Sequence, residues 1–184
     1  MSKNFWETER LLLRAVEPDD WEVHYHWDMD SDMMRNLSEL YFPHGKASVK
    51  KWAEDAALHD PTGDKFHMEI ELKVTQEVIG VLSGKLKDRR SGHFEYGIAI
   101  RDDFKRNGYA TEAILCIMRF YFDEMRCQKC TVQMHGLNLG SIKLHEALGF
   151  IKEGEIRRAI YTMGTYHANL YYGMTIEEYH ERYN

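Results

Sequence analysis

Residues 96–113 are the stretch that most constrains the fold. They begin as an alternating apolar run that ends at Ile100, continue as a short polar turn containing Gly108, and end in a long pattern of helical spacing. This order predicts a strand, a tight turn and a helix. The first amides of such a helix have no intrahelical partner and lie at the positive end of its dipole, so the turn predicts an anion-binding site.

The residues of the turn favour a phosphate ligand over a carboxylate. Gly108 lets a ligand approach the main chain closely, because it has no Cβ. Lys105 and Arg106 place two cations beside the amides. Two adjacent cations suit a pyrophosphate better than a lone carboxylate. We therefore expect the function to begin with a phosphate-bearing cofactor.

Length and charge limit the kinds of partner. The 184 residues can bury a core of their own, and a single domain over residues 1–184 is predicted. The net charge of −6 argues against nucleic acid as a partner, since phosphate backbones bind basic faces. No apolar run reaches the roughly 18 residues of a membrane span, so no membrane partner and a cytoplasmic location are expected.

No metal site is expected from the cysteines or from the acidic residues. Cys116, Cys127 and Cys130 define neither a disulfide framework nor a four-ligand zinc site. The acidic stretch at residues 28–32 has the spacing of a calcium loop, but Met33 stands where that loop needs glycine.

Two interpretations of this acidic stretch stay open. The simpler one is a solvated acidic turn. In the other, its carboxylates attract a cationic substrate. The candidate substrate-binding residues are Asp28, Asp30 and Asp32.

Hydrophobic periodicity and turn residues predict the remaining elements. Strands are expected at residues 11–13, 66–74, 78–86, 93–101, 130–135, 150–156 and 168–174. Helices are expected from Pro18 onward, at 48–58, 108–124 and 139–148, and as one or two turns within 175–184, with turns at 43–45 and 60–63.

Three motifs resemble those of the GCN5-related N-acetyltransferases (GNAT), and together they are similar to the RimJ/RimL branch over residues 7–174. Lys105-x-x-Gly108-x-Ala110 resembles the Gln/Arg-x-x-Gly-x-Gly/Ala signature, with lysine where glutamine or arginine is usual. Lysine keeps the charge but lacks the planar fork of arginine. The other two motifs are Asn138-x-x-Ser141-x-x-Leu144-His145-x-x-Leu148-Gly149-Phe150 and Thr8-Glu9-Arg10-Leu11-Leu12-Leu13-Arg14.

The resemblance implies a fold and an activity. The fold would be α/β (α+β), with a mixed, mostly antiparallel sheet of about seven strands flanked by helices. The activity would be acetyl-CoA-dependent N-acetyl transfer by direct attack of a primary amine. The acceptor would be a protein N-terminus such as that of a ribosomal protein, or alternatively a polyamine, aminoglycoside or amino sugar. An acyl-CoA-binding sensor without turnover is the alternative of another class, and both a monomer and a homodimer stay open.

The resemblance also assigns cofactor residues. Backbone groups of Ile98, Ala99 and Ile100 would pair with the pantetheine arm, and one of their N–H groups would polarise the thioester carbonyl. Asn138 and Ser141 would bond the arm and lie near its sulfur. The residues that would hold the pyrophosphate are Lys105, Arg106, Asn107, Gly108, Tyr109, Ala110 and Thr111.

Three residues are candidates for catalysis, each with a structural alternative. His145 would protonate the leaving thiolate, or pack as a helix histidine. Ser141 would donate near the sulfur, or serve only in the first helical turn. Glu95 would be the general base, because it shares a strand face with Gly97 and Ala99, which leave room there. Its alternative is an exposed carboxylate without a catalytic role.

Overall fold

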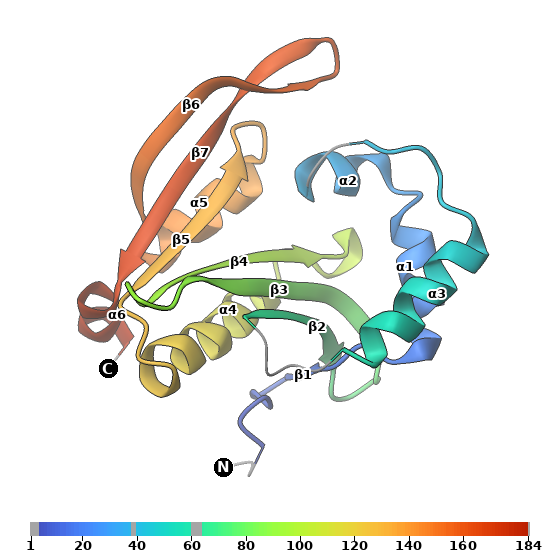
Figure 1. The fold of residues 1–184 in the computed structure, drawn as a ribbon, viewed down its shortest axis with the longest axis horizontal. Coiled ribbons are helices and arrows are strands. Elements are labelled where there is room, and N and C mark those ends of the chain that lie inside the picture. The colour runs from blue at the N-terminus through green and yellow to red at the C-terminus, as the bar shows by residue number, and fades with distance from the viewer. Residues whose placement is uncertain (1–3, 38–39, 60–63, 184) are drawn as a thin grey trace. The chain divides into compact units, whose positions relative to one another are not determined.

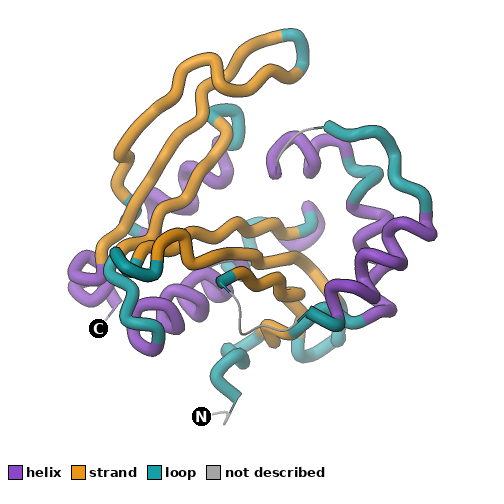
Figure 2. Tube along the Cα trace, viewed as in Figure 1, coloured by secondary structure: helices purple, strands orange, loops and turns teal. Residues whose placement is uncertain are grey.

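The computed structural model describes residues 4–37, 40–59 and 64–183, and their strands form one mixed sheet flanked by helices (Figures 1 and 2). The strands are β1 (Leu11–Arg14), β2 (Lys65–Leu72), β3 (Val78–Asp88), β4 (His93–Ile100), β5 (Lys129–His135), β6 (Ile151–Thr162) and β7 (Thr165–Thr175). Their order in the sheet is β1-β2-β3-β4-β5-β7-β6. All seven strands coincide with segments predicted from the sequence.

The helical elements are, in chain order, η1 (Pro18–Asp20), α1 (Trp21–Trp27), α2 (Ser31–Leu37), α3 (Lys46–Ala57), η2 (Asp102–Phe104), α4 (Tyr109–Arg119), the π-helical η3 (Phe120–Glu124), α5 (Leu139–Leu148) and α6 (Ile176–Tyr183). The chain divides into two compact units: Met1–Ser83 with Ile98–Cys116, and Gly84–Gly97 with Ile117–Asn184. Strands β3 and β4 and helix α4 each run through both units.

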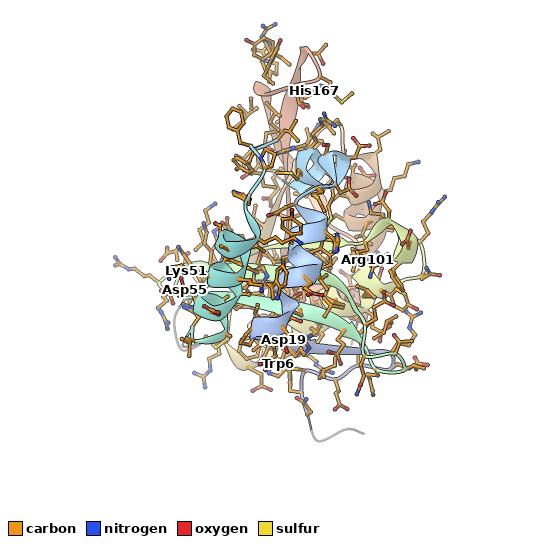
Figure 3. All side chains as sticks on the ribbon, turned by 90° about the vertical axis from the view of Figure 1, so that its right-hand side faces the viewer. Trp6, Asp19, Lys51, Asp55, Arg101 and His167 are labelled. Carbon is orange, nitrogen blue, oxygen red and sulfur yellow. The ribbon has the colours of Figure 1, made fainter. Side chains whose placement is uncertain are left out.

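In the first unit, β1 pairs antiparallel with β2 and supplies two buried leucines. Leu11 and Leu13 alternate with more exposed residues, and Leu13 pairs with the buried Ile70. Helices α1 and α3 are neighbours, and α3 turns Val49 and Ala53 inward. The outer face of α3 is polar, with the exposed i,i+4 pair of Lys51 and Asp55 at 3.2 Å (Figure 3).

In the second unit, β7 is the central strand between β5 and β6 and pairs antiparallel with both. Strand β4 pairs parallel with β5, so the sheet is mixed as predicted. The hairpin of β6 and β7 is longer than the sequence predicts, because both strands continue to a two-residue turn. Met163 and Gly164 of that turn have φ of 52° and 76°, as tight hairpin turns require.

Two local features differ from the predicted elements. Helix α2, which is not among the predicted helices, begins within the acidic stretch at residues 28–32. Its start is fixed by the Asp30 side chain, which accepts from the amides of Asp32 and Met33. Helix α4 ends at Arg119 and passes into η3, so the helix predicted over 108–124 has two parts. The turn predicted at 60–63 lies outside the described residues.

No helix in the described ranges combines the length and the apolar character needed to cross a membrane.

Candidate active site

The predicted anion site is the turn between η2 and α4 in the first unit. Arg106 and Gly108 adopt φ of 63° and 83°, the left-handed region that favours glycine. Left-handed residues in such a turn orient neighbouring N–H groups into a concavity that binds anions. The structure therefore places a curved main chain directly before the positive end of α4.

The amides of this turn have no acceptor in the described chain. The N–H of Glu112 donates to the carbonyl of Gly108 at 3.1 Å, which begins the helical ladder. Within residues 4–37, 40–59 and 64–183, no group accepts a hydrogen bond from the amides of residues 106–111. The first amides of a helix have no intrahelical acceptor and are open to an external one, so these amides fit a phosphate-bearing ligand.

Arg10 braces the turn from the N-terminal segment. Its Nη1 donates to the carbonyl of Asn107 at 2.9 Å, and its Nε donates to Oε2 of Glu112 at 2.8 Å. Its guanidinium also lies 4.5 Å from the ring centroid of Tyr109. The Arg10 side chain therefore contacts both the loop before α4 and the first helical turn of α4. These contacts give the arginine of the N-terminal motif a structural role.

Glu112 completes this brace. Its Oε1 accepts from the main-chain N–H of Arg10 at 2.8 Å and from the hydroxyl of Thr8. Burial raises the pKa of Glu112, but the hydrogen bonds from Thr8 and Arg10 outweigh burial and lower it overall. The carboxylate is thus charged near neutral pH. The sequence offered no signal for this pairing, because Arg10 and Glu112 lie 102 positions apart.

The side chains of the turn are themselves engaged. The Nζ of Lys105 pairs with the carboxylate of Asp102, one helical turn earlier. The Nδ2 of Asn107 donates to the carbonyls of Phe104 and Lys105 at 3.2 and 3.1 Å. Arg106 is exposed. Asn107 therefore holds the loop shape, and the main chain of the turn is the candidate anion-binding element of this unit.

The end of β4, at Ile98–Ile100, lies close to β3 in the same unit. A Cβ on Gly80 would stand 2.3 Å from the carbonyl oxygen of Ala99, so only glycine fits there. The N–H of Arg101 donates to the carbonyl of Ile79 at 2.8 Å. These contacts fix the main chain to which the resemblance assigns the pantetheine arm.

In the second unit, Asn138 caps α5. Its Oδ1 accepts from the amide of Ser141 at 3.0 Å, so Asn138 is the N-cap of this helix. Ser141 is half-buried in the first turn of the helix. Asn138, Ser141 and His145 therefore lie in sequence along one short helix.

His145 is buried among aromatic rings. Its Nδ1 lies 2.8 Å from the carbonyl of Ser141 and 3.3 Å from the Ser141 hydroxyl. Since a carbonyl only accepts, Nδ1 carries the proton, and Nε2 is buried without a partner in the described chain. The rings of Tyr96 and Phe150 lie 5.9 and 5.2 Å away. Burial lowers the pKa of His145, and the Ser141 hydrogen bond only partly opposes it.

Glu95 is held by two lysines of β3. Its carboxylate oxygens lie 2.8 Å from Nζ of Lys85 and 3.1 Å from Nζ of Lys87. Burial raises its pKa, but the two ammonium groups together outweigh burial and lower it. A carboxylate with a lowered pKa is a weak base, so this arrangement favours the structural alternative for Glu95.

The three carboxylates of the acidic stretch each have a local partner. Asp28 accepts from His44 at 3.0 Å, Asp30 caps α2, and Asp32 pairs with Arg35 at 2.9 Å. All three carboxylates lie in the first unit, and each has its own partner there.

Comparison with known proteins identifies the family. The profile of the acetyltransferase (GNAT) domain matches residues 10–151. An uncharacterized N-acetyltransferase of Bacillus subtilis (strain 168), the SPbeta prophage-derived YokL, is 34% identical over 179 residues, which is 97% of either chain.

Two solved structures share the fold at 18% identity and a TM-score of 0.79. One is a spermidine N-acetyltransferase from Vibrio cholerae in complex with CoA and spermine, with 94% of this chain and 99% of that chain covered. The other is RimL, a ribosomal L7/L12 alpha-N-protein acetyltransferase in complex with CoA, with 93% and 97% covered. The predicted sheet fold is confirmed. Because the domain profile spans most of the chain and a relative matches nearly its whole length, this chain belongs to the GNAT acetyltransferases, acyltransferases that use acetyl-CoA as the acetyl donor.

Proposed function

We propose that this chain transfers the acetyl group of acetyl-CoA to the α-amine of a peptide or protein N-terminus, as a member of the RimJ/RimL branch. The observation that carries the proposal is the turn before α4 together with the first turn of that helix. The amides of residues 106–111 there have no acceptor in the described chain, and Arg10 holds the main chain through the carbonyl of Asn107. A pyrophosphate would accept hydrogen bonds from these amides.

Each part of the coenzyme would have its own residues. The amides of residues 106–111 would bind the pyrophosphate, and Arg106 would add a charge beside it. The main chain of Ile98–Ile100 would pair with the pantetheine arm as an added strand. The fixed position of Ala99 against Gly80 supports this assignment, because a rigid strand orients its ligand well.

The chain's own groups would orient the reaction. Bound acetyl-CoA supplies an activated acetyl group as a thioester. The acceptor nitrogen forms a bond to the carbonyl carbon, the carbon–sulfur bond breaks, and the proton lost by nitrogen balances the one gained by sulfur. A main-chain N–H within Ile98–Ile100 would stabilise the developing oxyanion. The hydroxyl of Ser141 would donate to the sulfur.

The weak basicity of Glu95 supports an α-amine as the acceptor. An α-amine with a pKa near 8 is already about a tenth neutral at pH 7, whereas a lysine amine at 10.4 needs roughly 3 kcal/mol more to lose its proton. The carboxylate of Glu95 is paired with the ammonium groups of Lys85 and Lys87, so it is a weak base and would offer little of that energy. An acceptor that is partly neutral in water needs only a water-relayed base.

A small polycation is the second candidate acceptor. The sequence of the acidic stretch suits such a cation, but in the structure its three carboxylates already have partners. Asp28 pairs with His44, Asp30 accepts from the α2 amides, and Asp32 pairs with Arg35. Carboxylates that already have partners attract an ammonium group less strongly. We therefore rank the small amine below the peptide N-terminus.

Thiol release from acetyl-CoA with three acceptors tests the proposal. The first is a peptide with a free N-terminus and no lysine, the second is the same peptide N-acetylated and with one lysine, and the third is spermidine. We expect turnover with the first only, and kcat/KM that rises with pH up to about 8 as the amine loses its proton. Turnover with spermidine alone would favour the small amine, and CoA binding without turnover would point to a sensor.

A further inference from the structure

Two histidines and a glutamate form a cluster in the first unit to which the proposed acetyl transfer assigns no role. His24 comes from α1, and His67 and Glu69 lie two positions apart on β2, so their side chains share one face of the strand. One ligand atom from each residue lies within 4.8 Å of the others. Three residues from two elements thus converge on one point.

The cluster is incomplete in its hydrogen bonding. Nε2 of His24 donates to Oε1 of Glu69 at 2.7 Å, and Nε2 of His67 lies 3.7 Å from that oxygen. Glu69 is 0% exposed, yet its Oε2 has no partner in the described chain, and neither has the buried Nε2 of His67. Buried polar atoms without partners are costly, so these two atoms point to a missing ligand.

An aromatic ring packs against the cluster of His24, His67 and Glu69, and both histidines are partly exposed to solvent. The Trp52 ring from α3 lies 4.4 Å from the His24 ring and 5.4 Å from the His67 ring. The side chains of His24 and His67 are 13% and 33% exposed. An indole therefore packs against both imidazoles, and the side chain of His67 stays partly exposed to solvent.

We propose that His24, His67 and Glu69 bind a divalent first-row transition-metal ion of the zinc type. Two imidazoles and one carboxylate are a donor set that zinc and its neighbours accept, with a fourth position left for water. Zinc bonds of about 2.0–2.2 Å place tetrahedral ligand atoms roughly 3.4 Å apart, so the cluster needs only small side-chain shifts. The ion would be a partner for the two buried atoms that have none in the described chain, Oε2 of Glu69 and Nε2 of His67.

Binding exchanges one hydrogen bond for coordinate bonds. The Nε2 proton of His24 moves to Nδ1 through solvent, the His24–Glu69 hydrogen bond is lost, and three donor atoms face the ion. The ion would link α1 directly to β2, with Trp52 packed over the imidazoles. The three proposed ligands have no role in the proposed acetyl transfer. The metal proposal therefore does not depend on which amine accepts the acetyl group.

Metal titrations of the folded chain test this site without acetyl-CoA. After treatment with a chelator and its removal, zinc is added in competition with a chromophoric chelator, and cobalt(II) is added separately to record visible absorption. We expect one equivalent of zinc per chain and cobalt bands of a four- or five-coordinate site. H67Q and E69Q should weaken zinc binding by at least about tenfold and abolish the cobalt bands.

H26Q is the matched control, because His26 is exposed on the same helix and outside the cluster. It should bind zinc within about twofold of the unmodified chain. Circular dichroism establishes that each variant is folded, and E69Q keeps the size of the buried side chain if H67Q unfolds. Equal zinc binding by all variants, or no cobalt bands in the unmodified chain, would overturn the proposal.

Discussion

At the residue scale, the chemistry of the charged side chains is set by their partners. The clearest example is Arg14 of β1, whose two terminal nitrogens bond both carboxylate oxygens of Asp20 at 2.8 Å while its Nε bonds Glu71 at 2.5 Å. Asp20 is 7% exposed and also accepts from the amide of Glu17 at 2.7 Å. This network holds the start of η1 against the first strand.

The network predicts an acid-dependent stability. Burial raises the pKa of Asp20, but its hydrogen bonds to Arg14 and Glu17 outweigh burial and lower it below its ordinary 3.8. A lowered folded-state pKa stabilises the fold above pH 3.8, and this contribution is lost as the pH falls through the folded-state value. In urea titrations D20N should lose about 3 kcal/mol of unfolding free energy at pH 7 and show a smaller acid dependence.

Asp19 provides the control for this prediction, since it is the exposed neighbour in the same short helix. D19N should change the unfolding free energy by no more than about 0.5 kcal/mol. Equal losses in D19N and D20N would show that the Arg14 network contributes nothing specific.

His145 gives a second prediction at this scale. A general acid contributes about 10² to 10⁴-fold to the rate, and it must carry a proton that it can give. The buried His145 has a lowered pKa, and its Nδ1 proton is bonded to the Ser141 carbonyl. We therefore expect H145F to keep kcat within about threefold and to keep its pH profile. A large loss of kcat with a changed profile would establish the acid role instead.

At the element scale, the local strand, turn and helix of residues 96–113 were predictable, but the contacts that hold them were not. Hydrophobic alternation and Gly108 are local signals. The Arg10–Glu112 brace and the cluster of His24 with Glu69 join residues far apart in the sequence, and no periodicity reports them. The spacing His67-x-Glu69 on a strand was a usable signal, because it places both side chains on one face.

The contact between β3 and β4 predicts a sensitive glycine. In G80A the new methyl group must displace the Ala99 carbonyl, which would stand 2.3 Å away. We expect unfolding free energy to fall by about 1 to 3 kcal/mol and CoA affinity to fall with it, since the proposed pantetheine strand moves. Denaturant titration and calorimetry measure both.

Gly45 is the matched position, with nothing within 4 Å of a new Cβ. G45A should leave CoA affinity unchanged. If G80A binds CoA as tightly as G45A does, the position of Ala99 is not needed for the coenzyme.

At the scale of the whole molecule, the sequence motifs predict the family more securely than the acceptor. The fold, the enzyme class and the acetyl donor follow from motifs that are each a short continuous piece of the sequence, and the comparisons confirm them. The acceptor depends on how separate side chains meet and on their protonation. Glu95 illustrates the difference, because only the structure reveals its partners Lys85 and Lys87.

The central claim is that the main-chain amides before α4 bind the coenzyme's pyrophosphate. Calorimetric titration of the folded chain with CoA tests it most directly, with G108A and G164A as the paired variants. Both glycines have positive φ, 83° and 76°, so both substitutions strain the main chain, but only Gly108 lies in the proposed anion site. We expect the unmodified chain and G164A to bind CoA alike and G108A at least about tenfold more weakly. Absence of heat in the folded, unmodified chain, or equal affinity in G108A, would contradict the account.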